Sequence, residues 1–142
     1  MLALLRPDSW NLPLFLHVLG ATLLFGTVGA LTAAGFAIRG RPDHQLVLAR
    51  LAQRTFLLGV IPAYVLMRVA AQWIDDKEFP NGGEPGWVGV GFLVSDAGAV
   101  LLIVVGILLA VRRRRILLAV PLLTALYLIA LAAAWFAMSG KP

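Results

Sequence analysis

Hydrophobic residues form four long blocks along this chain, and short polar or turn-rich stretches separate them. The blocks cover about residues 12–38, 55–74, 87–111 and 116–138. Each is long enough to cross a bilayer as a helix, which takes about 20 mostly apolar residues. Lipid offers no partner to open backbone groups, so the blocks are expected to be helical. The pattern predicts an all-α polytopic membrane protein, in which residues 1–142 form a single domain, a four-transmembrane-helix antiparallel bundle.

Composition narrows the function classes further. Hydrophobic residues make up 61% of the chain, charged residues make up 13%, and there is no cysteine, whereas a soluble domain is about half apolar and about a quarter charged. Without cysteine the chain has no disulfide scaffold and no cysteine-ligated metal site. It also lacks a nucleotide-binding glycine motif and a histidine-rich metal motif. The sequence therefore predicts no catalytic residues and no metal ligands.

The net charge of +5 is distributed unevenly between the connections. Those after the first and third blocks are rich in arginine, and the one after the second block is acidic. Since positive connections stay on the cytoplasmic side, we expect both termini and the acidic connection to lie outside the plasma membrane. Basic residues divided between two short turns at a membrane face are unsuited to nucleic acid. The residues concerned are Arg39, Arg41, Arg50 and Arg54; Arg112, Arg113, Arg114 and Arg115; and Asp75, Asp76, Glu78 and Glu84.

Four tryptophans support the same topology. Trp10 precedes the first block, and Trp73 ends the second. Trp87 opens the third block, and Trp135 lies near the end of the fourth. All four then fall at the outer interface, a depth that suits an apolar ring with a polar N–H group. We expect these tryptophans and the arginine run 112–115 to anchor the topology.

Prolines and small residues indicate how the blocks are shaped and packed. Residues 44–54 carry an apolar and a basic side at helical spacing, which predicts an amphipathic turn of helix at the membrane interface. Pro62 and Pro121 remove backbone donors inside the second and fourth blocks, so we expect bends there. Small residues four apart let helices approach closely in lipid. On the first block these are Gly26, Ala30 and Ala34.

Three ionisable side chains lie inside the blocks: His17, Arg68 and Asp96. At a rise of about 1.5 Å per residue they lie roughly 8, 9 and 13 Å from the outer ends of their helices. Such residues are costly in lipid and normally find a partner. We therefore expect Arg68 to pair with Asp96 and His17 to join them. Tyr64, four residues before Arg68, lies on the same helix face.

Three interpretations of this polar cluster stay open. It is a structural staple that fixes helix packing, or a pocket open to the outer face for a proton relay, a haem or a small ligand, or Arg68 extends to the interface without a partner. A haem would use His17 as a single axial ligand or would lie between the two subunits of a dimer, because His44 lies on the opposite side of the membrane and one subunit cannot bring both imidazoles to one iron. No other cofactor is predicted.

A short stretch of the first block resembles a known group of proteins. The run Leu14-Phe15-Leu16-His17-Val18-Leu19-Gly20-Ala21, followed by Gly26, resembles the first span of small bacterial membrane proteins related to the copper-resistance D superfamily. The closing residues 135–142 are similar to the ends of uncharacterised actinobacterial proteins. The resemblance implies a four-helix bacterial protein, with His17 as the family-type histidine and a link to haem. An oxidase in this group carries a lysine in its third span, where this chain carries Asp96.

The sequence favours a non-enzymatic role for a small integral protein of the bacterial plasma membrane. We expect an accessory or interaction subunit whose partners are the lipid bilayer and either a second copy or another membrane protein. One alternative is a haem-binding or proton-coupled redox protein that uses His17 with Arg68 and Asp96. A further alternative is a small transporter, which would need to form an oligomer to line a path.

Overall fold

The computed structural model describes residues 8–139, and these residues are almost entirely helical. No strand occurs in this part of the chain. Four helical stretches are long and apolar enough to cross a membrane, which confirms the expected all-α four-helix architecture. The helices are α1 (Asn11–Gly40), α2 (Gln45–Thr55), α3 (Ile61–Glu78), α4 (Gly86–Val111), α5 (Arg114–Leu117) and α6 (Val120–Ser139), with short 3₁₀ turns at Asp8–Trp10 and Pro42–His44.

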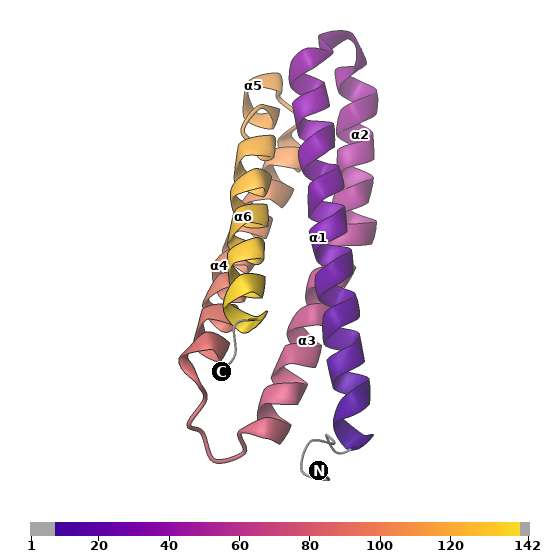
Figure 1. The fold of residues 1–142 in the computed structure, drawn as a ribbon. Coiled ribbons are helices and arrows are strands. Elements are labelled where there is room, and N and C mark those ends of the chain that lie inside the picture. The colour runs from indigo at the N-terminus through magenta and orange to yellow at the C-terminus, as the bar shows by residue number, and fades with distance from the viewer. Residues whose placement is uncertain (1–7, 140–142) are drawn as a thin grey trace.

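The bundle consists of two packed groups of helices joined through α1 and α6 (Figure 1). α1 packs along α2 and α3 on one side and against α6 on the other, and α6 packs against α4. Within the described residues α3 and α4 pack only weakly against each other. α1 begins and α6 ends toward the end of the bundle that holds the connection 79–85, which we call the acidic end. The opposite end carries the turns after α1 and α4, and we call it the arginine end.

The second span is longer than the sequence pattern predicts. Instead of an interfacial turn over 44–54, α2 continues through a π-helical turn, Phe56–Val60, into α3, so the span runs from Pro42 to Glu78. α2 runs alongside α1 (Figure 1), because its small residues Ala49 and Ala52 are buried and allow close packing. The expected start of this span at residue 55 was therefore wrong.

Both prolines inside the spans lie at the start of a regular helix, next to an irregular turn. Pro62 directly follows the π-helical turn, where its missing N–H cannot bond to the preceding turn. Pro121 follows the break between α5 and α6. Arg39 of α1 donates a hydrogen bond of 2.7 Å to the Leu118 carbonyl at this break. A residue read from sequence only as a topology charge thus also satisfies an open backbone acceptor.

Close helix approach occurs at Gly20 of α1 rather than at Gly26 and Ala30. Gly20 of α1 lies against α3, where an added Cβ atom would stand 2.6 Å from the Met67 backbone nitrogen. Gly26 is exposed, with nothing within 4 Å of its Cβ position, and Ala30 is exposed too. Gly26 and Ala30 therefore face away from the neighbouring helices, whereas Ala34 packs against the apolar core. A spacing of four places small residues on one face but does not say toward which neighbour that face turns.

The core is mostly apolar, and a polar link between α1 and α6 lies within it. Thr32 of α1 donates a hydrogen bond of 2.8 Å to the Thr124 hydroxyl of α6, and both side chains are buried. The Thr124 hydroxyl in turn donates to the Val120 carbonyl. The apolar core around this link includes Leu24, Val28, Leu31, Phe56, Val60, Leu102, Val105, Leu109, Leu117 and Tyr127.

Candidate functional site

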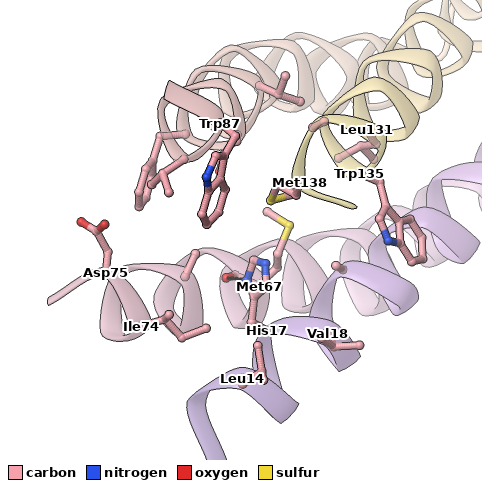
Figure 2. A pocket seen from close by; sticks show the side chains of 18 of the residues that line it. Leu14, His17, Val18, Met67, Ile74, Asp75, Trp87, Leu131, Trp135 and Met138 are labelled. Atoms are coloured by element: carbon pink, nitrogen blue, oxygen red, sulfur yellow. Dashed lines mark hydrogen bonds between the residues drawn. The ribbon is translucent and has the colours of Figure 1, made fainter. Parts of the chain in front are cut away.

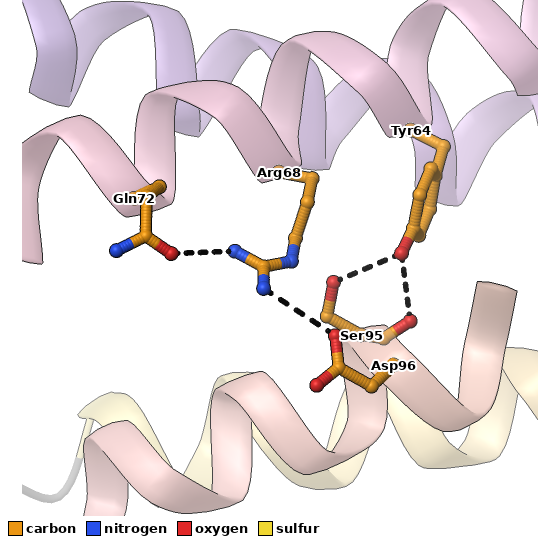
Figure 3. A network of polar contacts seen from close by, with 5 residues as sticks. All are labelled: Tyr64, Arg68, Gln72, Ser95 and Asp96. Carbon is orange, nitrogen blue, oxygen red and sulfur yellow. Dashed lines mark hydrogen bonds and ion pairs between the residues drawn. The ribbon is translucent and has the colours of Figure 1, made fainter.

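A polar network bridges α3 and α4 in the acidic half of the bundle (Figure 3). Arg68 Nη2 lies 3.4 Å from Asp96 Oδ1, so the structure brings the expected ion pair together. Arg68 Nη1 donates to Gln72 Oε1 at 3.2 Å, and Gln72 Nε2 donates to Asp76 Oδ1 at 3.1 Å. Tyr64, Arg68, Gln72 and Asp76 follow one another at intervals of four, so they form one row along α3.

Tyr64 and Phe92 hold the network from both helices. The Tyr64 hydroxyl donates to the Ser95 carbonyl of α4 at 2.9 Å and lies 3.4 Å from the Ser95 hydroxyl. The Arg68 guanidinium carbon lies 4.6 Å from the centre of the Phe92 ring, a distance that allows cation–π attraction. Because α3 and α4 pack so little against each other otherwise, these polar bridges are the main links across their seam.

The ion pair lies on the outside of the bundle. Figure 3 shows it between α3 and α4, with the other helices behind. The Arg68 side chain is 29% exposed and the Asp96 side chain is 65% exposed. Asp96 lies ten residues after Gly86, and Arg68 lies ten residues before Glu78, which corresponds to about 15 Å of helix from the acidic end. A carboxylate therefore faces outward within the expected membrane span, in its acidic half.

An apolar groove adjoins this network along the same seam. Its volume is about 390 Å³, and it lies between α3 and α4 on the arginine side of the ion pair. Tyr64 belongs to both features, because its ring lines the groove and its hydroxyl reaches Ser95. The other lining residues are Phe56, Ile61, Val65, Ala99, Leu102, Ile103 and Gly106.

A second hollow lies among all four spans at the acidic end (Figure 2). It has a volume of about 320 Å³, and most of its wall is apolar and aromatic. The polar side chains that line it are His17, Asp75, Glu78, Ser95 and Ser139. The apolar wall includes Leu14, Val18, Phe25, Met67, Ile74, Trp87, Phe92, Leu131, Trp135 and Met138. We call this hollow the central cavity.

His17 belongs to the central cavity and does not join the ion pair. Its Nδ1 atom lies 3.1 Å from the Met67 carbonyl oxygen of α3. A carbonyl only accepts hydrogen bonds, so Nδ1 donates, and the Nε2 lone pair of the neutral ring is left free. The expected cluster of His17 with Arg68 and Asp96 is therefore divided into an inner group and an outer group. Depth along a helix can be counted from the sequence, but the direction around the helix axis cannot.

The central cavity does not suit a haem. His17 offers one free imidazole nitrogen, as an axial ligand would require. Haem also carries propionate groups, and basic side chains are the partners that suit carboxylates. Within the part of the chain that the structure describes, no lysine or arginine lines the cavity, and its two acidic residues, Asp75 and Glu78, would repel propionates. His17 thus suits the haem iron, whereas Asp75 and Glu78 oppose the haem propionates.

The expected topology anchors lie at opposite ends of the bundle. Trp10, Trp73, Trp87 and Trp135 all lie toward the acidic end, where Trp87 and Trp135 also line the central cavity. The four arginines 112–115 are exposed at the arginine end. Arg112 has an additional role, because its guanidinium donates to the Gln53 side chain and so ties the end of α4 to α2.

Some of the polar groups at these sites can be recognised from the sequence alone. Gln72 and Asp76 continue the interval of four that begins at Tyr64 and Arg68, a signal present in the sequence. Asp75 and Glu78 count in the sequence only as charges of the acidic connection. Their position on the cavity wall depends on how α3 is rotated against α1 and α4.

Comparisons of this chain with protein-family models, with curated proteins and with solved structures give no match. The relation to the copper-resistance D superfamily stays a prediction. The function has to be inferred from the geometry of the chain itself.

Proposed function

We propose that this small integral membrane protein is a non-enzymatic accessory or interaction subunit that binds a membrane partner through the α3–α4 seam. The exposure of Asp96 carries this proposal, since 65% of its side chain is uncovered on the outside of the bundle. A charged side chain at the centre of a bilayer costs about 2.5–3.5 kcal/mol or more. Arg68 offsets part of that cost, and a partner that covers the carboxylate would offset the rest.

The seam also indicates what the partner has to provide. The groove beside the ion pair is apolar, so it suits the apolar side chains of a transmembrane helix. Asp96 suits a basic side chain or a hydroxyl or amide donor on the same helix. A second copy of this chain and a different membrane protein are both partners of this kind, and the experiment below separates them by mass.

We further propose that the protein lies in the bacterial plasma membrane with both termini and the acidic end outside. The separation of charges supports this orientation, because exposed arginines occupy one end and all four tryptophans lie toward the other. Arginine-rich connections stay in the cytoplasm, and tryptophan rings favour the interface.

Photocrosslinking in intact membranes tests the partner surface. Leu93 and Val100 are 70% and 64% exposed, and they lie three residues before and four residues after Asp96, on its face of α4. Each is replaced in turn by the photoreactive residue benzoylphenylalanine. The matched control is Ile129 of α6, which is 68% exposed and lies ten residues from the end of its helix at Ser139.

We expect protein adducts from the α4 positions and lipid adducts alone from position 129. Adducts of twice the monomer mass would identify a second copy as the partner. The protein adducts should be lost in the double variant Arg68→Leu/Asp96→Leu, which leaves no charge unpaired. Lipid adducts alone from positions 93 and 100 would contradict the proposed function.

A further inference from the structure

The charged side chains on the wall of the central cavity are all acidic among the described residues. Asp75 and Glu78 line it, and no lysine or arginine of residues 8–139 does, although the chain as a whole has a net charge of +5. Both acids belong to the last turn of α3, and a spacing of three places them on one face of that helix. The wall of an otherwise apolar hollow thus carries negative charge at its acidic-end mouth.

Asp75 has an unused acceptor. Its Oδ1 atom is buried and has no hydrogen-bond partner among residues 8–139. A buried acceptor without a partner is costly, so such atoms in folded proteins usually meet a donor. Figure 2 shows Asp75 toward the same end of the cavity as Trp87, while Trp135 lies at the other end. The unused oxygen therefore marks a place where a ligand donor would be favoured.

The rest of the wall suits a compact apolar body. Phe25, Trp87, Phe92 and Trp135 contribute aromatic rings, and aliphatic side chains fill the space between them. A volume of about 320 Å³ lies at the lower end of the range of small-molecule sites, about 300–1,000 Å³. Aromatic faces also attract cations. Shape, apolar lining and charge thus favour the same kind of ligand.

We propose that the central cavity binds a lipophilic amine, with a compact apolar body among the aromatic and aliphatic side chains and a protonated nitrogen at Asp75 and Glu78. The same ammonium chemistry occurs in the headgroup of phosphatidylethanolamine. That headgroup also carries a phosphate, which the two carboxylates would repel, so a free amine matches the site better. This site does not depend on the partner surface at Asp96.

Three probes with one apolar cage test the charge preference. They are 1-aminoadamantane, which is cationic, 1-adamantanol, which is neutral, and adamantane-1-carboxylate, which is anionic. Binding to the full-length protein in maltoside micelles is measured by equilibrium dialysis against empty micelles. We expect the amine to bind at least about tenfold more tightly than the alcohol, a difference of about 1.4 kcal/mol. The carboxylate should bind more weakly than the alcohol.

Isosteric variants locate the charge responsible. Asp75→Asn and Glu78→Gln should each reduce the preference for the amine and leave the affinity for the alcohol unchanged. Asp76→Asn is the matched control, because Asp76 neighbours Asp75 on α3 and does not line the cavity. Circular dichroism and gel filtration show whether each variant keeps its fold.

Two results would overturn the proposal. Equal affinities of the unmodified protein for the three probes would show that the cavity has no charge preference. An equal loss in Asp76→Asn and Asp75→Asn would assign the preference to general surface charge. Phosphatidylethanolamine added to the micelles distinguishes the two sources of ammonium. Displacement of the amine by this lipid would replace the free amine with a lipid headgroup as the ligand.

Discussion

At the scale of single residues, the Arg68–Asp96 pair is a favourable contact between two charges in a membrane span, where each charge is costly. Each charge alone would be costly at this depth, and pairing lowers the cost for both. The pair also has help from its neighbours, since Gln72 accepts from the guanidinium and the Phe92 ring lies beneath it. The energetic value of the pair is therefore mostly the avoidance of an unpaired charge.

This argument predicts a specific pattern of stabilities in detergent. Asp96→Leu should destabilise the protein by about 1–3 kcal/mol, because it leaves the Arg68 guanidinium without its carboxylate. The double variant Arg68→Leu/Asp96→Leu should recover most of that loss, since replacing both charges removes the unpaired group. Thermal unfolding of the purified variants measures both effects. A double variant that is less stable than Asp96→Leu would show that the pair is not the source of the loss.

The residue types predicted this pair, but they did not predict where His17 points. Arg68 and Asp96 are the residues of opposite charge inside the spans. Because pairing lowers the cost of both charges in lipid, the residue types alone predict this pair. His17 has a similar depth, yet Gly20 brings α1 so close to Met67 that the imidazole meets a backbone carbonyl of α3. Which neighbour a side chain meets depends on the rotation of packed helices, and that rotation is a property of the whole bundle.

At the scale of elements, α4 and α6 meet where a glycine faces an aromatic ring. A Cβ atom added at Gly98 of α4 would overlap the ring and hydroxyl of Tyr127, which is buried on α6. Tyr127 is among the largest buried side chains, so its ring has little room to move. Gly98 is therefore the residue that sets how closely these two helices approach.

We predict that Gly98→Ala is destabilising although alanine is the better helix former. The added methyl group forces α4 away from α6, and such overpacking costs about 1–3 kcal/mol. Gly89→Ala is the matched control on α4, because nothing lies within 4 Å of its Cβ position. This control should be neutral or up to about 1 kcal/mol stabilising. Thermal unfolding of both variants checks the prediction, and equal effects would contradict it.

The boundaries of a helix can be predicted from the sequence only where the hydrophobic pattern is compatible with a single arrangement. The third block, expected over 87–111, agrees closely with α4 at Gly86–Val111. Residues 44–54 are amphipathic, a pattern shared by a helix on the membrane surface and by one that extends beyond the bilayer beside another helix. The burial of Ala49 and Ala52 shows that these residues form a helix packed beside another helix. This burial depends on contact with α1 rather than on local sequence.

At the scale of the whole molecule, the two ends of the bundle differ in chemistry. The arginine end has two tight turns with exposed guanidinium groups, and Arg112 closes one of them with a positive φ of 54°. The acidic end holds the longer connection 79–85 and the mouth of the central cavity. This polarity was readable from the sequence, because loop charge and tryptophan positions depend on residue order alone.

The proposed orientation predicts how single cysteines react, and the chain has no cysteine of its own to interfere. Asn81→Cys lies in the connection at the acidic end and Arg114→Cys lies at the arginine end, both at exposed positions. A membrane-impermeant maleimide should label Asn81→Cys in intact cells and Arg114→Cys only after lysis. The reverse result would invert the proposed topology while leaving the bundle intact.

The sparse packing between α3 and α4 has a consequence for the motion of the bundle. Separating these helices disrupts a few polar bridges, whereas separating α1 from α3 or α4 from α6 exposes buried apolar core. Fluctuations should therefore concentrate at this seam, with α1 and α6 acting as the hinge. Because the central cavity lies behind the seam, a solute dissolved in the bilayer would have a sideways route to it. Such a solute would not have to pass through water first.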